Sequence, residues 1–351
     1  MRIAQVAPLT ESVPPQLYGG TERIVAYLTD ELVRLGHDVT LFASGDSQTL
    51  AKLSPAWPQA LRLGGHCWDP LAPHLLMLEG VAKRADEFDV LHFHVSQFHF
   101  PLARRLPVAN ITTLHGRLDI PEIVPLYQEY LDVPIVSISD AQREPLPVAG
   151  WTGTVPHGLP LDLLHFREEP DDYVVFLGRI AREKRVDRAI QIATACGRRL
   201  RIAAKVDAAD RDYCDREIRQ LLDHPLVEFI GEIDERQKQD VLGGASALLF
   251  PIDWPEPFGL VMIEALACGV PVLAFRGGSV DEVIDEGVTG VVVESVDEAI
   301  AALPVVESLD RRRCRAVFEE RFSARRMAED YVALYEAVIA RKASGMLSGV
   351  A

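Results

Sequence analysis

Two glutamates eight positions apart, Glu256 and Glu264, are the residues of this chain whose type and spacing most clearly suggest chemistry. They lie in the stretch PIDWPEPFGLVMIEALACGVPVLAFRGG, residues 251–278. The pattern predicts a loop and then a helix from about Phe258 to Cys268, apolar nearly all round, with Glu264 in its middle. Because burial of an unpaired carboxylate is costly, we expect Glu264 to meet a partner at a cleft.

The ends of this helix are marked by residues that suit them. Pro257 suits the first helical position, where its missing N–H costs nothing. Gly269 suits the left-handed position after the last turn, and Pro271 prevents the helix from continuing. A short apolar strand, residues 270–275, is expected to follow.

This layout suits an extended anionic ligand. The first N–H groups of a helix lack internal partners, the helix dipole favours negative charge there, and Gly259 lets a ligand approach the backbone closely. At a rise of ~1.5 Å per residue, Glu264 lies roughly 8 Å along the helix, about the reach from a diphosphate to ribose hydroxyls. Glu256 then suits the hydroxyls of a second sugar. The alternative is that Glu256 complements the helix dipole and Glu264 is a core carboxylate paired with an arginine.

The run EPFGLVMIEALACGVPV resembles the E-x7-E signature of retaining glycosyltransferases, above all family 4, whose fold is GT-B. In that family the first glutamate contacts the donor sugar and the second contacts the nucleotide ribose. The resemblance implies these roles for Glu256 and Glu264, and a part in catalysis for Glu256. The residues assigned to donor binding around the helix start are Phe258, Gly259, Leu260 and Val261.

Two cations follow a predicted strand over Tyr173–Leu177, in the segment GRIAREKR. The resembling family shows GRxxxxKG here, with the arginine and the lysine on the donor pyrophosphate. The resemblance therefore implies that Arg179 and Lys184 clamp a diphosphate and act in catalysis, since forked arginine donors match phosphate oxygens. Arg185 stands where the family usually has glycine. The alternative is an ordinary solvated loop.

The chain opens as strand, loop, helix and strand over residues 1–43, with a Gly-Gly pair before the helix that begins near Thr21. Glycines at a helix start after a first strand suggest a phosphate contact, although the pair is not the GxGxxG of a dinucleotide fold. In the resembling family a GGxE stretch closes on the donor diphosphate. This implies a backbone contact at Gly20, with Gly19 allowing the bend; a plain turn is the alternative.

A predicted strand over residues 111–114 delivers His115 at its carboxyl end, where α/β sheets place ligands. The resemblance implies that His115 lies close to the donor sugar and the reaction centre; a strand-end histidine bonded to a loop carbonyl is the alternative. His92, His94 and His99 lack further metal-ligating residues nearby in the sequence and are interpreted as pocket-lining or structural side chains. No metal site is predicted.

Three further segments carry weaker predictions. The resemblance implies that the backbone after the strand of residues 227–230 reads the nucleotide base, which points to Gly231, Glu232 and Ile233. Lys205, at the end of another strand, is placed to reach the phosphates or the base. Residues 45–73 are interpreted as an irregular variable loop with a short helix on the acceptor side.

Composition narrows the class of protein. The 351 residues carry 36 basic and 52 acidic side chains, a net charge of −16, which argues against a nucleic-acid partner. The five cysteines are scattered and predict reduced thiols in a cytoplasmic protein. The N-terminus has no signal-peptide pattern and no apolar run reaches the length of a membrane span, although peripheral contact with a membrane stays open.

These patterns predict an α/β protein with the GT-B fold, in which two doubly wound Rossmann-like domains face each other across a cleft. Residues 1–160 are assigned to the acceptor side and residues 161–325 to the nucleotide-sugar donor side. The resemblance implies that the helix within residues 326–351, ahead of a frayed tail, returns to the first domain.

The predicted function is transfer of a sugar from a nucleoside-diphosphate sugar, most often uridine-linked in this family, to an acceptor that is a sugar, a lipid-linked group or a small molecule. The family implies retention of configuration, a front-face route in which the leaving phosphate takes the acceptor proton, and no bound cofactor or metal. Two alternatives remain: a GT-B sugar-nucleotide epimerase, and a non-catalytic two-lobed protein that binds sugar nucleotides.

Overall fold

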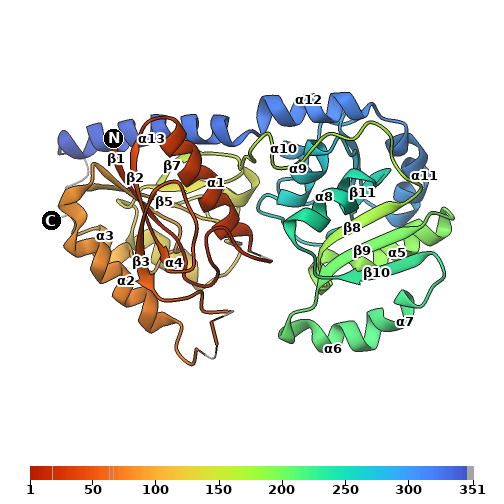
Figure 1. The fold of residues 1–351 in the computed structure, drawn as a ribbon, viewed down its shortest axis with the longest axis horizontal. Coiled ribbons are helices and arrows are strands. Elements are labelled where there is room, and N and C mark those ends of the chain that lie inside the picture. The colour runs from red at the N-terminus through yellow and green to blue at the C-terminus, as the bar shows by residue number, and fades with distance from the viewer. Residues whose placement is uncertain (18, 63, 66, 346–351) are drawn as a thin grey trace. The chain divides into compact units, whose positions relative to one another are not determined.

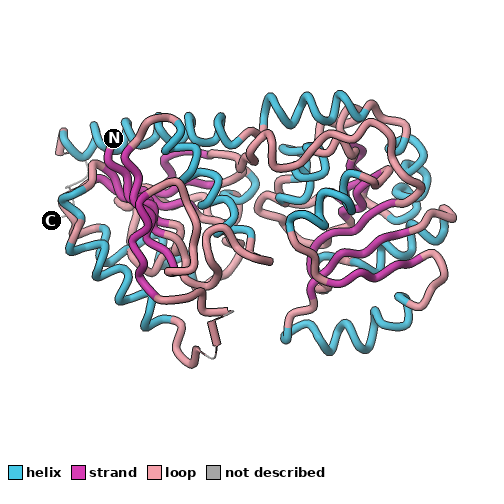
Figure 2. The backbone as a smooth tube through the Cα atoms, in the orientation of Figure 1, coloured by secondary structure: helices cyan, strands magenta, loops and turns pink. Residues whose placement is uncertain are grey.

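The structure is a computed structural model that describes residues 1–17, 19–62, 64–65 and 67–345 (Figure 1). The chain divides into two compact units. The first unit comprises Met1–Gly158 and the chain from Ala324 onward, and the second comprises Leu159–Ser323. In both units strands form the centre and helices surround them (Figure 2).

The first unit is built on a parallel sheet. Within the described residues this sheet has seven strands in the order β3-β2-β1-β4-β5-β6-β7. The strands are β1 (Arg2–Val6), β2 (Asp38–Ser44), β3 (Lys52–Trp57), β4 (Val90–Phe93), β5 (Ala109–Thr113), β6 (Ile135–Ser137) and β7 (Trp151–Thr154). The helices are α1 (Gly20–Arg34), α2 (Leu71–Lys83), α3 (Phe100–Ala103), α4 (Ile123–Glu129), α13 (Ala324–Ala343) and the short 3-10 turns η1 (Ala85–Glu87) and η2 (Ala141–Arg143).

The second unit repeats this plan. Its described residues form a parallel sheet of six strands in the order β10-β9-β8-β11-β12-β13. The strands are β8 (Val174–Arg179), β9 (Leu200–Lys205), β10 (Val227–Gly231), β11 (Ala247–Phe250), β12 (Val272–Phe275) and β13 (Gly290–Val293). The helices are α5 (Val186–Ala195), α6 (Arg211–Tyr213), α7 (Arg219–Leu222), α8 (Glu235–Gly243), α9 (Leu260–Ala267), α10 (Val280–Val283), α11 (Val296–Glu307) and α12 (Arg311–Arg321), with the 3-10 turns η3 (Arg182–Lys184) and η4 (Ala208–Asp210) and a π-helical turn η5 (Cys214–Ile218).

Both strand orders are doubly wound, which confirms the predicted fold class. In the first sheet the order reverses between β1 and β4, and in the second between β8 and β11. Open α/β sheets bind ligands beyond the carboxyl ends of the strands at this reversal. The residues that follow β1, β4, β8 and β11 are therefore the ones that the fold offers for function.

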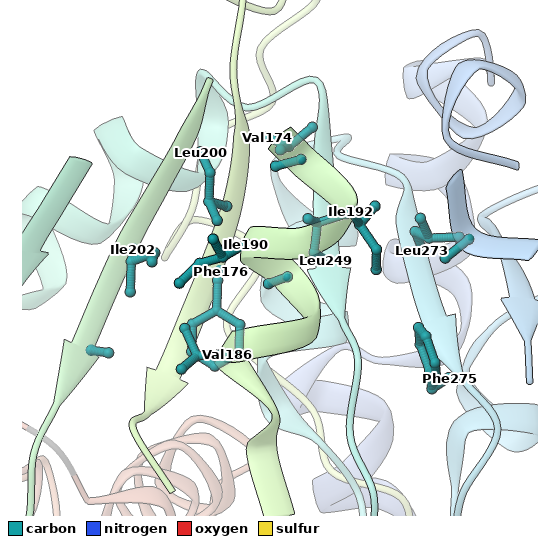
Figure 3. Packing of buried hydrophobic residues seen from close by; sticks show 14 of the residues in the cluster. Val174, Phe176, Val186, Ile190, Ile192, Leu200, Ile202, Leu249, Leu273 and Phe275 are labelled. Atoms are coloured by element: carbon teal, nitrogen blue, oxygen red, sulfur yellow. The ribbon is translucent and has the colours of Figure 1, made fainter. Parts of the chain in front are cut away.

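The central strands of the second sheet carry apolar side chains on both faces, as expected for a parallel sheet that is covered on both sides. Figure 3 shows α5 laid against one face, where Val186, Ile190 and Ile192 pack on side chains of β8, β9 and β11. Phe176 and Leu249 belong to the same cluster. The other face is covered by α9, which contacts β11 and β12. This packing fixes the carboxyl ends of the central strands.

The helix α13 belongs to the first unit, where it packs on α1 and β5. Figure 1 shows it as the blue helix that runs beside that unit's sheet. The helix buries Met327, Tyr331, Tyr335 and Val338, and Leu334 packs over Gly153 of β7. The tyrosine hydroxyls meet buried polar groups of the sheet, so α13 covers a face that is partly polar.

The prediction that residues 45–73 are irregular is wrong in part. The segment contains β3, which pairs in parallel with β2 at the edge of the sheet. Pro55 within this strand argues against a central strand, but an edge strand tolerates proline because one side of it makes no ladder hydrogen bonds. Helix α2 starts at Leu71, before the end of this segment.

Within the described residues, no helix combines the length and the apolar character that a membrane span requires. The five cysteines all lie in the described part of the chain and are free thiols. The end of the predicted tail, residues 346–351, lies outside the described residues.

Candidate functional site

The segment between β11 and α9 carries Glu256 at the reversal of strand order in the second unit. The helix begins at Leu260, so the expectation that it starts near Phe258 with Pro257 in its first position is wrong. Gly259 precedes it in the left-handed region, with φ 74°. This positive φ favours glycine, whereas the nearest atom to an added Cβ, the Met262 methyl at 2.7 Å, is the end of a flexible side chain that can move. The predicted left-handed glycine after the helix, Gly269, is confirmed at φ 80°.

The first turn of α9 is partly open. Leu260 and Val261 are half-buried, whereas Phe258 is buried and packs against Phe322 with ring centroids 6.2 Å apart. The backbone N–H groups of a first helical turn have no intrahelical acceptors. The Met262 N–H already donates to the Gly259 carbonyl at 2.9 Å. The assignment of residues 258–261 to binding of the nucleotide sugar stays a prediction.

The carboxylate of Glu256 is buried, with 8% of the residue exposed, and it is paired with a cation. Its Oε2 forms an ion pair with the Lys184 ammonium and accepts a hydrogen bond from the Trp254 indole at 3.0 Å. The Lys184 ammonium also lies 4.7 Å from the centre of the Trp254 ring. The structure thus brings together two of the residues that the sequence assigned to catalysis.

A glycine loop after β12 supports the backbone of Glu256. The Glu256 carbonyl accepts a hydrogen bond from the Ser279 N–H at 2.9 Å. Gly278 has φ 57°, and a Cβ on it would lie 2.2 Å from the Glu256 carbonyl oxygen. Only glycine fits so close to this loop. No local sequence pattern indicated this role of Gly278, because α9 and β12 lie between the two segments in the chain.

Glu264 has a partner, as expected, and the partner is a lysine. The Lys238 ammonium on α8 lies 2.7 Å from Glu264 Oε1, and Lys238 also approaches Glu235 at 3.3 Å. Both members of the Lys238–Glu264 pair are more than nine-tenths buried. Burial of either charge alone would cost free energy, and the ion pair offsets that cost. The sequence analysis missed Lys238.

Arg179 lies at the end of β8 among carboxylates. It bonds Glu183 at 2.8 Å and approaches Asp207 at 3.6 Å and Asp210 at 3.4 Å. Burial raises the pKa of Asp210, with Arg179 acting in the opposite direction. Lys205, the neighbour of Arg179 across the sheet, pairs with Asp207 at 2.7 Å. Arg179 and Lys205 were predicted from the sequence, whereas the carboxylates that surround them were not.

The backbone conformation at Arg185 explains why glycine is usual at this position in the resembling family. Its backbone is left-handed, with φ 52°, a conformation that costs most side chains free energy. Its guanidinium is held by Asp187 and Asp253, each at 2.8 Å. The Asp253 N–H also donates to the Glu183 carbonyl at 2.8 Å. The segment after β8 is therefore tied to the segment after β11.

The residues predicted to read a base lie at the end of the edge strand β10. Gly231 has φ 79°, Glu232 is exposed and Ile233 is half-buried. They lead directly into α8, whose start is fixed by a reciprocal hydrogen-bond pair between Asp234 and Gln237. Because α8 also carries Lys238, this segment is linked through one helix to Glu264.

In the first unit, Gly20 is the first residue of α1, and Gly19 precedes it. A Cβ on Gly19 would approach Pro15 at 2.8 Å, so the close packing of this loop requires glycine. Tyr18, which comes before this pair, lies outside the described residues. Glu22, in the first turn of α1, is buried, and burial together with the charge of Glu11 raises its pKa to about 7.

His115 follows β5 and is bonded to another histidine. Its Nε2 lies 2.9 Å from Nδ1 of His94, and its ring stacks on His157 with centroids 5.3 Å apart. Burial lowers its pKa to about 3, so the imidazole is neutral near neutral pH. The alternative of a bond to a loop carbonyl does not describe its Nε2.

The other histidines of this strand region have structural partners. His92 meets the Tyr335 hydroxyl and Thr113, each at 2.7 Å, and His99 meets Thr112 at 2.7 Å. Among the described residues, no group of three or more histidine, cysteine, aspartate and glutamate side chains is arranged to hold a metal ion.

Comparison with known proteins agrees with the fold. The model of "Glycosyl transferases group 1" matches residues 165–315, and that of "Glycosyltransferase Family 4" matches residues 18–139. A phosphatidyl-myo-inositol mannosyltransferase of Mycolicibacterium smegmatis is 26% identical, over 93% of this chain and 89% of its own.

Solved structures resemble the chain over almost its full length. AviGT4, a glycosyltransferase involved in avilamycin A biosynthesis, has a TM-score of 0.74 at 25% identity, covering 99% of this chain and 98% of its own. Anabaena HepE, solved with UDP and glucose, has a TM-score of 0.72 at 18% identity, covering 96% and 100%. The fold is that of GT-B glycosyltransferases. The chain is a glycosyltransferase of this type, similar to family 4.

We predict that Gly278→Ala lowers stability much more than Gly287→Ala. Both glycines have positive φ, 57° and 70°, but a Cβ on Gly287 meets nothing within 4 Å. Gly287→Ala should cost only the strain of a left-handed alanine, about 1–2 kcal/mol. Gly278→Ala adds a clash with the Glu256 backbone and should cost about 2–5 kcal/mol. Urea unfolding measures both, and equal losses would contradict the packing of this loop on Glu256.

We also predict a pH effect from Glu22. Its raised pKa means that the folded state holds the proton more tightly than the unfolded state, so the stability that it contributes is full below the ordinary glutamate pKa, falls as the pH rises from there, and is lost once the pH passes about 7. The loss at pH 8.5 should be about 3 kcal/mol. Glu22→Gln removes it, so this variant should unfold at a higher temperature than wild type at pH 8.5 but not at pH 4.5.

The matched control is Glu79→Gln, an exposed glutamate paired with Lys83 on α2. Its melting temperature should follow that of wild type at both pH values. A Glu22→Gln variant that also follows wild type would show that Glu22 is ionised at little cost.

Proposed function

We propose that this glycosyltransferase binds a nucleoside-diphosphate sugar on its second unit, transfers the sugar with retention of configuration, and uses no metal. One observation carries the proposal. Two buried carboxylates of one segment, Glu256 and Glu264, are each paired with a lysine from another element, on either side of the start of α9. This arrangement supplies donors for phosphate, flanked by acceptors for hydroxyl groups.

The ion pairs indicate how a diphosphate would be held. Lys184 is bonded to Glu256 and its long side chain can turn toward phosphate oxygens. Glu256 is then left with acceptor capacity for the hydroxyls of the donor sugar. Arg179, at the end of the neighbouring strand, adds a forked donor. Fixed cations and helix N–H groups stabilise charge on a leaving diphosphate, the role that a metal plays in other enzymes.

The same logic applies to the nucleoside. Lys238 keeps Glu264 ionised in a buried position, and an ionised carboxylate accepts hydrogen bonds from two neighbouring hydroxyls. We assign Glu264 to the ribose and the backbone of Gly231, Glu232 and Ile233 to the base. A uridine base is favoured because the similar HepE was solved with UDP and with UDP-glucose.

For the first unit we keep the roles that the resemblance implies. His115 is assigned to the reaction centre, and Gly19 and Gly20 to a backbone contact with the diphosphate. The chemistry is a front-face displacement in which the leaving phosphate takes the proton of the acceptor. The acceptor is a sugar, a lipid-linked group or a small molecule; one relative is named for phosphatidyl-myo-inositol. The five free thiols favour a cytoplasmic enzyme.

A direct test begins with thermal shifts in a panel of nucleotides and nucleotide sugars, including UDP, GDP and UDP-glucose. Donors that stabilise the protein are then incubated with it in the presence of EDTA, and the products are followed by proton NMR. We expect slow hydrolysis of the preferred donor that first yields the sugar in the donor's own anomeric configuration. Absence of turnover would favour a binding protein, and a changed sugar still linked to the nucleotide would favour an epimerase.

We predict that Glu256→Gln and Glu264→Gln separate sugar recognition from nucleoside recognition. Glu264→Gln removes a charged acceptor of ribose hydroxyls and should weaken UDP binding by about 1.5–3 kcal/mol. Glu256→Gln should leave UDP affinity almost unchanged while transfer falls by ~10²-fold. Calorimetry with UDP and the transfer rate give the two readouts. If Glu256→Gln loses UDP binding as severely as Glu264→Gln, the donor does not lie along α9 as proposed.

We further predict that Arg179→Met and Lys184→Met reduce turnover more than they reduce stability, because both side chains face charge that grows in the transition state. Arg182→Met, from the same loop, is the control: its guanidinium pairs with Glu217 at the surface. This control should keep turnover within about twofold, since exposed pairs contribute little. Normal turnover in an Arg179→Met, Lys184→Met double variant would show that neither residue acts on the diphosphate and that both are charged side chains of an ordinary solvated loop.

A further inference from the structure

The face of the first sheet under α13 carries a row of buried polar side chains. Gln5 of β1 and His92 of β4 are register partners, and Thr113 of β5 lies next to them. The hydroxyls of Tyr331 and Tyr335 on α13 cover this row. Each of these residues is almost fully buried, so their hydrogen bonds must satisfy one another.

The hydrogen bonds of the row have a direction. The Gln5 amide nitrogen donates to the Tyr335 hydroxyl at 3.0 Å, so this hydroxyl donates in turn to His92 Nδ1 at 2.7 Å. A neutral imidazole has one N–H, so His92 carries its proton on Nε2 and donates to Thr113 at 2.7 Å. Thr113 then donates to Tyr331 at 2.8 Å.

A branch of the same network reaches the end of β5. The oxygen of the Gln5 amide lies 2.8 Å from His94 Nε2, which must therefore be protonated. His94 Nδ1 is then an acceptor, and the group that donates to it at 2.9 Å is Nε2 of His115. Nδ1 of His115 is left with a lone pair; it is buried and has no hydrogen-bond partner within the described residues.

Burial keeps these rings neutral, so each ring carries a single N–H. It lowers the pKa of His92 and of His94 well below the ordinary value. His115 behaves in the same way. Besides burial, the groups that lower the pKa of His94 are other histidines. A chain of neutral imidazoles can hold only the tautomers that its end groups dictate, and here the end group is the Gln5 amide.

We propose that Gln5, oriented by the Tyr335 hydroxyl, acts through His94 to fix His115 as the tautomer protonated at Nε2, so that Nδ1 is the nitrogen left to accept a hydrogen bond from a substrate hydroxyl. Gln5, His94 and Tyr335 are positioning residues. The inference rests on the proposed role of His115 for its consequence in catalysis, but not for the tautomer itself. It also gives α13 a function: the far end of the chain sets the state of a residue after β5.

The tautomer can be measured without substrate. Protein labelled with ¹⁵N-histidine gives imidazole signals that distinguish a protonated from an unprotonated ring nitrogen, and loss of a signal in His115→Gln assigns His115. We expect wild type to show His115 with a protonated Nε2 and an unprotonated Nδ1. A protonated Nδ1 in wild type would overturn the proposal without the need for any variant.

Substitution of Gln5 then tests the cause. Gln5→Met removes the amide at nearly constant volume and should give His115 a mixture of both tautomers. Thr112→Val is the control: Thr112 is the buried threonine next to Thr113 and bonds only His99 among the histidines, so the His99 signals alone should change.

Turnover of UDP-glucose, or of the donor that the nucleotide panel selects, links the tautomer to function. For Gln5→Met we expect kcat to fall about tenfold with KM little changed, and for Thr112→Val we expect both to stay near wild type. Unchanged His115 signals in Gln5→Met would overturn the inference. If wild type turns over no sugar nucleotide, the proposed function fails, while the NMR spectra still decide the tautomer.

Discussion

The pairing of two buried carboxylates with lysines is the interaction on which the second unit's site depends. Burying Glu256 or Glu264 alone would be costly, and each lysine removes that cost only where it arrives from another element. Lys184 follows β8 and Lys238 lies on α8. The site can exist only if the turn after β8, the start of α9 and the helix α8 are all correctly placed. The parallel sheet and its apolar core provide that placement.

The polar groups around Glu256 and Glu264 and those under α13 are stabilised in different ways. The second unit uses full charges in pairs, and its surroundings at Arg179 are rich in carboxylates. The first unit uses neutral groups, in which glutamine, histidine, threonine and tyrosine satisfy one another under α13. Charged pairs can exchange partners with an incoming anion, because a phosphate competes for the same cations. A neutral network instead holds fixed donors and acceptors, which suits the recognition of hydroxyl groups.

The sequence was sufficient for the fold class and for most central strands, because buried parallel strands are continuous apolar runs. It was insufficient at the edges. Strand β3 contains Pro55 and is half-exposed, so its pattern is weak. The start of α9 was misplaced because Pro257 is a good first helical residue, whereas the left-handed Gly259 decides the boundary. Contacts across the chain were also out of reach: Lys238 lies 26 positions from Glu264, and no local pattern connects them.

Arg185 shows how sequence departures from a family pattern can be interpreted once the backbone is known. At this position the chain turns with φ 52°, which glycine adopts without strain. An arginine accepts the strain, and its guanidinium bonds both Asp187 and Asp253. Asp253 belongs to the segment that carries Glu256. Arginine in place of glycine therefore adds backbone strain at this position, but its side chain links the turn after β8 to the segment before α9. Because Lys184 immediately precedes this turn, the link also restricts the lysine that pairs with Glu256.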